Sequence, residues 1–217
     1  MKKTGLLIVG MFALAALQAQ TLTIQGGTTF SRLNWHTDGT LHSERYEKML
    51  IGYSGFVGVD YLEKKHFNLS TNAGFIRKGG KEINEFRDET GAKIGEDVSK
   101  TKLDYVSINT VASVKAPIND KFTAFLSAGP RFDYLLSCKS EYGELDFDNQ
   151  WAKPDRNSYG MIVGGGLKYS LSAVQVGVRA DYYIECNEIA DWIVWPDGNT
   201  RITSQTYSVN LTLGYKL

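Results

Sequence analysis

The fold is decided by the stretch Tyr207-Ser208-Val209-Asn210-Leu211-Thr212-Leu213-Gly214-Tyr215-Lys216-Leu217. Its odd-numbered residues are apolar or aromatic, and its even-numbered residues are polar or small. Successive side chains of a β-strand point to opposite faces, so this period of two predicts a strand with one apolar and one polar face.

Seven further segments show the same period. The clearest apolar stripes run through residues 51–61, 122–134, 159–169 and 174–182, and weaker ones lie near 22–35, 66–78 and 102–115. An even number of strands is expected of a single-chain bacterial barrel. The sequence therefore predicts an all-β fold, an eight-stranded antiparallel transmembrane β-barrel arranged as an up-and-down meander.

The polar face separates a membrane barrel from a soluble one. A soluble barrel packs its apolar face inward and carries Lys and Glu outside, whereas here the polar face is rich in Gly, Ser, Thr and Asn with few charges. That composition suits a narrow lumen, and a soluble sheet remains the alternative. We expect the charges on this face to meet and pair inside the lumen: Asp60, Arg131, Asp133, Arg179, Asp181 and Lys216.

Aromatic residues give a second test, because membrane barrels carry aromatic girdles at both interfaces. On the apolar face, one set lies near one end of the strands and a second set lies near the other. The first contains Tyr61, Phe67, Phe122, Tyr169 and Tyr215, and the second contains Tyr134, Tyr159, Tyr182 and Tyr207. Paired aromatics are separated by a height of roughly 20–30 Å, which matches an apolar band of about 25 Å.

The N-terminus has the pattern of a secretory signal peptide. Lys2 and Lys3 precede an apolar run from Gly5 to Leu17, and small residues around Ala19 offer a cleavage site. The run is shorter than the roughly 20 residues of a spanning helix, although an uncleaved anchor is the alternative. We expect residues 1–19 to be the signal peptide and residues 20–217 to form one barrel domain.

Connection lengths give an orientation. Residues 63–66, 117–120 and 170–172 form short turns, whereas 36–48, 79–101, 138–157 and 186–202 form long loops. Short periplasmic and long external connections are typical of outer-membrane barrels. We therefore expect the Gram-negative outer membrane, with lipid around the barrel and both termini periplasmic.

Charge excludes one class of partner. The chain has 24 basic and 24 acidic residues, so no electrostatic attraction to nucleic acid is indicated.

Three motifs carry a family resemblance: Ala128-Gly129-Pro130-Arg131-Phe132, Gly164-Gly165-Gly166 and the closing Leu213-Gly214-Tyr215-Lys216-Leu217. Together with the signal peptide and eight strands, they resemble the PorT-like outer-membrane β-barrel family of Bacteroidota. The resemblance covers the whole mature chain and implies an accessory role in secretion across the outer membrane. The closing motif resembles the signal read by the barrel-insertion machinery, with Leu217 where Phe is commoner.

Cys138 and Cys186 are the two cysteines, and both fall at the outer ends of their segments. The envelope permits oxidation, so we expect a Cys138–Cys186 disulfide; the alternative is two thiols kept apart by the strand between them.

The sequence offers little chemistry. His42-Ser43-Glu44 are loop neighbours, which rarely form a triad, and the acidic stretch Glu141 to Asp148 lacks the glycine of an EF-hand. We expect no catalytic residue, cofactor or metal, and the charges from Lys78 to Lys102 indicate a mobile hydrophilic loop. Trp192 and Trp195 precede the hairpin signal Asp197-Gly198, which predicts an external ribbon. Its Trp side chains either pack on other loops, rest at the lipid headgroups or offer a contact site for another molecule.

These features favour a non-enzymatic outer-membrane protein whose external loops serve adhesion, protection or contact with an envelope or host partner. The alternatives are a secretion accessory, a lipid-modifying barrel enzyme and a narrow pore. A pore is less favoured because side chains fill an eight-stranded lumen.

Overall fold

The computed structural model describes residues 21–37, 48–140, 155–194 and 198–217, so the predicted signal peptide lies outside the described residues. The strands are β1 (Thr21–Thr37), β2 (Leu50–Asp60), β3 (Phe67–Arg87), β4 (Lys93–Pro117), β5 (Phe122–Ser140), β6 (Asn157–Leu171), β7 (Val174–Glu185), β8 (Ala190–Val194) and β9 (Gly198–Lys216). Within these ranges, no helix is long and apolar enough to cross a membrane.

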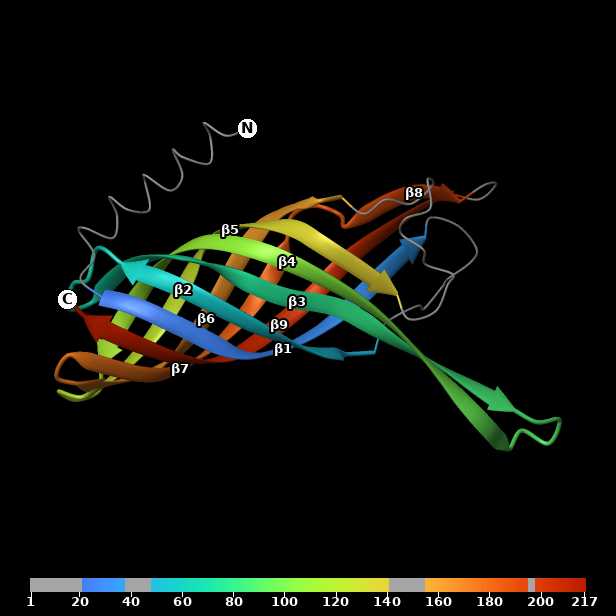
Figure 1. The fold of residues 1–217 in the computed structure, drawn as a ribbon, viewed down its shortest axis with the longest axis horizontal. Coiled ribbons are helices and arrows are strands. Elements are labelled where there is room, and N and C mark those ends of the chain that lie inside the picture. The colour runs from blue at the N-terminus through green and yellow to red at the C-terminus, as the bar shows by residue number, and fades with distance from the viewer. Residues whose placement is uncertain (1–20, 38–47, 141–154, 195–197) are drawn as a thin grey trace.

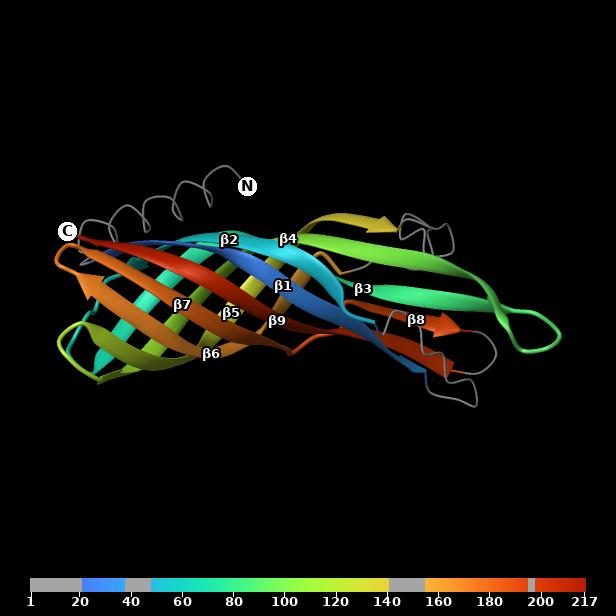
Figure 2. The same ribbon diagram turned by 90° about the horizontal axis from the view of Figure 1, so that it is seen from below.

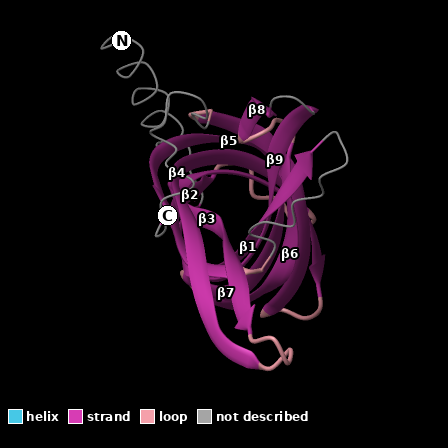
Figure 3. Cartoon of the chain, turned by 90° about the vertical axis from the view of Figure 1, so that its right-hand side faces the viewer, coloured by secondary structure: helices cyan, strands magenta, loops and turns pink. Residues whose placement is uncertain are grey.

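Eight of these strands form a closed antiparallel ring (Figure 3). Strands β1 to β7 follow one another around the ring, β9 pairs with β7, and pairing between β1 and β9 closes it. Closure leaves no free sheet edge through the barrel wall. The prediction of an eight-stranded antiparallel meander is confirmed.

The alternation of faces is also confirmed. In β9, Ser208, Asn210 and Thr212 are buried inside the ring, while Leu211 and Leu213 on the other face are 67% and 52% exposed. The other barrel strands likewise bury polar side chains and expose apolar ones, so the apolar face lies outside and the polar face lines the lumen.

The two ends of the barrel differ. At the end that we call the turn end, short connections link β2–β3, β4–β5 and β6–β7, and β9 reaches the end of the chain (Figures 1 and 2). At the other end, which we call the ribbon end, β3 and β4 run far beyond their neighbours as a two-stranded ribbon.

This ribbon corrects the loop predicted over residues 79–101. Pairing between β3 and β4 continues without interruption from the barrel to Phe86, opposite Gly95, before the register shifts at Arg87. The backbone groups that face the partner strand are therefore satisfied by the ladder, and those that point outward from the two edges of the ribbon can be satisfied by water.

A second ribbon lies at the same end, where β8 pairs with β9 from Ala190–Ile202 to Val194–Gly198. The predicted hairpin between these strands is therefore present, although residues 195–197 of its turn lie outside the described residues.

Apolar side chains fill the lumen toward the ribbon end. Leu33, Leu103, Leu135, Ile189 and Ile202 are all at least 94% buried and belong to one cluster. The barrel therefore has an internal hydrophobic core in addition to its apolar outer surface.

Candidate functional site

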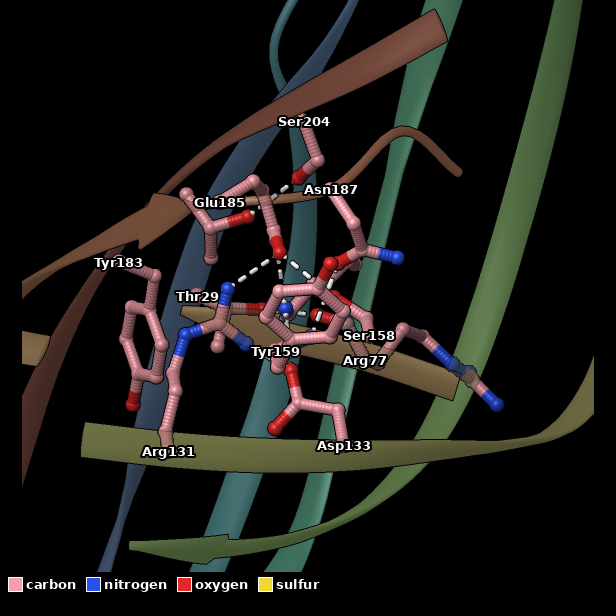
Figure 4. Close-up of polar contacts among 12 residues, drawn as sticks. Thr29, Arg77, Arg131, Asp133, Ser158, Tyr159, Tyr183, Glu185, Asn187 and Ser204 are labelled. Atoms are coloured by element: carbon pink, nitrogen blue, oxygen red, sulfur yellow. Dashed lines mark hydrogen bonds and ion pairs between the residues drawn. The ribbon is translucent and has the colours of Figure 1, made fainter. Parts of the chain in front are cut away.

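A layer of charged side chains crosses the lumen on the turn-end side of the apolar residues just named. The Lys78 ammonium from β3 reaches Asp133 Oδ2 on β5 at 2.6 Å and Glu185 Oε1 on β7 at 2.8 Å. Arg131 on β5 pairs with the same two carboxylates, as Figure 4 shows. We call these four residues the lumen charge layer.

The lumen charge layer is enclosed. Its four side chains are at most 3% exposed, and the Ser158 hydroxyl donates to Glu185 at 2.6 Å. The Lys78 Nζ lies 5.0 Å from the centre of the buried Tyr105 ring, and Arg131 lies 5.4 Å from that of Tyr183. Two cations balance two anions, so the charge of this closed cross-section is neutral.

The other predicted lumen charges lie elsewhere. Arg179 and Asp181 pair with each other at 2.7 Å, and Asp60 lies 3.6 Å from Lys168. Lys216 lies at the last residue pair between β1 and β9, at the turn end. The expected pairing of charges inside the lumen is present, but the expectation of one six-residue cluster is wrong: Arg131 and Asp133 belong to the lumen charge layer, and the other four residues lie apart from it.

Sequence reasoning missed two members of the lumen charge layer. Lys78 begins the predicted hydrophilic loop, and Glu185 lies between the predicted strand 174–182 and the predicted loop 186–202. The alternation of faces could have placed both residues in the lumen. Lys78 is an even-numbered residue of β3, like the buried Asn68 and Asn72 on its polar face. Glu185 is an odd-numbered residue of β7, like the buried Arg179 and Asp181.

A small polar cavity lies between these charges and the turn end. Its volume is about 30 Å³, which is room for roughly two water molecules. Asp60, Lys115, Lys168, Gln175 and Arg179 are among the residues that line it.

Glu63, from the turn between β2 and β3, binds Lys115 and Gln175, two of the residues that line this cavity. It accepts hydrogen bonds from Thr21 on β1 at 2.9 Å and from Lys115 on β4 at 3.3 Å. Burial alone would raise the pKa of the Glu63 carboxyl, but these bonds and the charge of Lys115 outweigh it and hold the pKa below its ordinary value. Glu63 thus links, as an anion, the β2–β3 turn to strands β1 and β4.

The tip of the β3–β4 ribbon has a defined turn. Asp88 Oδ1 accepts hydrogen bonds from the Thr90 hydroxyl at 2.6 Å and from the Thr90 and Ala92 amides at 2.9 Å. The hydroxyl bond, followed by the amide bonds, lowers the pKa of Asp88. Gly91 has φ of +83°, which a residue with a side chain rarely adopts.

The predicted disulfide is not formed. Phe132 pairs with Tyr159, whose carbonyl accepts the Cys186 amide, so Cys186 is level with Phe132 two strands away. Cys138 lies six residues farther along β5 (132 to 138), or roughly 20 Å at the rise of a strand. Because a disulfide needs Cα atoms within about 7 Å, the register itself keeps the cysteines apart.

The predicted aromatic residues all lie on the outer face. Phe67, Phe122 and Tyr215 are exposed near the turn end, and Tyr61 and Tyr169 are half-buried there. Toward the ribbon end, Tyr134, Tyr159 and Tyr207 are exposed, and the Tyr182 ring stacks on that of Tyr207 at 4.8 Å.

Other candidate residues lie partly or wholly outside the described residues. This holds for His42-Ser43-Glu44, for the acidic stretch from Glu141, and for Trp195, whereas Trp192 lies in β8 with an undescribed side chain. In the part of the chain that the structure describes, no three His, Cys, Asp or Glu side chains are grouped to hold a metal.

The model of the outer membrane protein beta-barrel domain family matches residues 8–184. The chain belongs to this family. Its place is therefore the outer membrane, in agreement with the apolar outer face. No curated protein sequence matches the chain.

Solved structures that are similar to this chain have low sequence identity with it. Neisserial surface protein A is 12% identical, with 90% of this chain and 97% of that chain covered and a TM-score of 0.47. Ail, the attachment invasion locus protein of Yersinia pestis, is 12% identical, with 92% and 99% covered and a TM-score of 0.43. The N-terminal β-barrel domain of Pseudomonas aeruginosa OprF is 9% identical, with 92% and 98% covered and a TM-score of 0.43.

Proposed function

We propose that this protein is a non-enzymatic outer-membrane anchor with a closed lumen, and that its ribbons contact envelope components or external partners, for adhesion or protection. The lumen charge layer carries the proposal. Lys78 bridges Asp133 and Glu185 across the lumen, and all three side chains are buried. A conducting path would have to separate these charges, which is costly in a medium of low dielectric constant.

The proposed orientation places the turn end and both termini in the periplasm and the ribbon end outside. The lengths of the connections support it. An epitope inserted after Gly91 should then bind antibody on intact cells, whereas the same epitope after Asn119 should require permeabilised cells. Labelling in the reverse order would refute the orientation.

The PorT-like assignment, and with it a role in secretion, rests on the three motifs quoted from residues 128–132, 164–166 and 213–217. Loss of secreted cargo from a deletion strain would support that role over adhesion.

Conductance tests the closed lumen. We expect the full-length protein in a planar bilayer to give current at the level of the protein-free membrane. Sustained channel currents from the wild type would overturn the anchor proposal in favour of a narrow pore. A gel-mobility shift on heating the same preparation verifies that the tested barrel is folded.

A further inference from the structure

A groove opens on the outer face of the barrel at the turn end, and we call it the turn-end groove. It is lined by three residues of the β4–β5 turn and by one aromatic residue each of β5 and β6: Asn119, Asp120, Lys121, Phe122 and Tyr169. Its volume is about 290 Å³, against about 30 Å³ for the polar cavity inside the lumen. The turn-end groove therefore admits a molecule much larger than water.

Hydrogen bonds fix the wall that the β4–β5 turn forms. Asn119 Oδ1 accepts the amides of Lys121 and Phe122 at 2.9 and 2.7 Å. The Ser170 amide of β6 donates to the Lys121 carbonyl at 2.9 Å, which ties this turn to the next strand. The backbone of the groove is thus held in place, and a ligand does not have to order it on binding.

The turn-end groove lies on the boundary between lipid and water. The centres of the Phe122 and Tyr169 rings are 4.7 Å apart, and both residues belong to the aromatic residues of the outer face at this end. From these rings the apolar outer face continues along the same two strands to Leu126 and Leu167, which are 73% and 52% exposed. Apolar chains can therefore run from the groove along the barrel wall.

Asp120 and Lys121 place one negative and one positive charge beside these rings. Neither residue forms an ion pair in the part of the chain that the structure describes, with the other or with any third residue. Both charges are exposed, so they are open to a ligand. Charge complementarity favours a ligand that has one anion and one cation on an apolar body.

We infer that the turn-end groove binds the headgroup of a zwitterionic phospholipid with a primary ammonium group, a phosphatidylethanolamine. Lys121 donates to its phosphate, Asp120 accepts from its ammonium, and its acyl chains leave over the Phe122 and Tyr169 rings. A phosphatidylglycerol has no cation for Asp120, and the quaternary nitrogen of a phosphatidylcholine has no N–H to donate. Lipid is favoured over a soluble zwitterion because the groove opens onto the face that meets the membrane.

The test uses full-length protein in phosphatidylcholine vesicles with equal small amounts of phosphatidylethanolamine and phosphatidylglycerol of the same acyl chains. We expect the wild type to retain phosphatidylethanolamine in preference to both other lipids, as counted by native mass spectrometry. Lys121→Gln should bind it about 5-fold more weakly, if this lysine contributes the energy found for a basic residue at a charged membrane surface. Asp120→Asn should remove the preference over phosphatidylglycerol, because the ammonium loses its partner while the phosphate keeps Lys121.

Lys65→Gln and Glu89→Gln are the matched controls, because each removes the same charge from an exposed site outside the groove. The inference is overturned if Lys65→Gln, also at the turn end, weakens binding as much as Lys121→Gln, or if Asp120→Asn keeps the wild-type preference. Displacement of the lipid by equimolar soluble phosphoethanolamine would also overturn it, by making a soluble zwitterion the ligand. Heat-dependent gel mobility verifies that each variant is folded. Lipid in both leaflets makes the result independent of orientation and of conductance, so the proposed function can fail separately.

Discussion

At the scale of single residues, Lys78 holds the lumen charge layer together, because its ammonium contacts carboxylates on two other strands. Replacing it in Lys78→Met leaves Asp133 and Glu185 with Arg131 as their remaining cation. We expect a loss of about 3–5 kcal/mol in the free energy of unfolding, the usual effect of removing one partner from a buried ion pair. Urea unfolding in lipid, followed by gel mobility, measures it.

Charge balance provides the control for Lys78. The double variant Lys78→Met/Glu185→Gln removes one cation and one anion, so much of the lost stability should return. Lys64→Met, at an exposed site, should leave the unfolding midpoint unchanged. An equal midpoint in Lys78→Met and wild type would show that the layer contributes nothing to stability.

The lowered pKa of Glu63 at the turn end predicts that the free energy of unfolding depends on pH. Its folded-state pKa lies below its ordinary value of 4.5, so its stabilising contribution is present above that pH and is lost as pH falls through the lower, folded-state pKa. Glu63→Gln should therefore cost about 1 kcal/mol at pH 7, and the difference from wild type should shrink below pH 4.5. A difference that stayed constant down to pH 3 would contradict this account, and Glu89→Gln at the ribbon tip is the control.

At the scale of elements, the β3–β4 ribbon depends on its turn. A Cβ at Gly91 would meet no atom within 4 Å, so Gly91→Ala adds only backbone strain at φ +83°. We expect a cost of about 1 kcal/mol, confined to the ribbon. Amide exchange near Phe86 should accelerate while exchange in the barrel strands stays unchanged.

Gly95 offers a matched comparison within the same ribbon. A Cβ there would lie 3.7 Å from the Phe86 ring, which is ordinary contact, so Gly95→Ala should leave the exchange rates alone. Equal acceleration in both alanine variants would mean that ribbon exchange does not report on the turn conformation.

The strands show what the sequence can predict. Period two identified the eight barrel strands and their two faces, because in a barrel wall one face meets lipid and the other the lumen. Along the ribbon, Ile83 and Glu85 share one face while Asn84 and Phe86 share the other. Neither face is buried by a sheet, so no periodic pattern distinguishes this extension from a loop.

The lumen charges were harder to predict for a different reason. Alternation assigned Arg131 and Asp133 to the inner face, but it contains no information about which strands meet across a barrel. The contact from Lys78 to Glu185 joins β3 to β7, and it follows from barrel closure and strand stagger. The same limit explains the Cys138–Cys186 prediction, since both residues were placed at the same end without a register between their strands.

At the scale of the whole molecule, barrel and ribbon should be separable. Beyond Lys81 and Lys100 the ribbon strands pair with each other, whereas the lumen charge layer and apolar core lie within the ring. Replacing residues 82–99 by an Asn-Gly turn, which suits a two-residue hairpin, should leave the free energy of barrel unfolding within about 1 kcal/mol of wild type. Contacts with external partners should be lost.

Replacing the same residues by a Gly-Ser linker of equal length is the control for chain length. If the ribbon is a display element, both variants should insert, show heat-dependent gel mobility and stop binding partners. A barrel that failed to fold without residues 82–99 would instead make the ribbon part of the folding unit. That result would refute the proposal that the barrel is an anchor and the ribbon a separate contact element, because the barrel would then need the ribbon in order to fold.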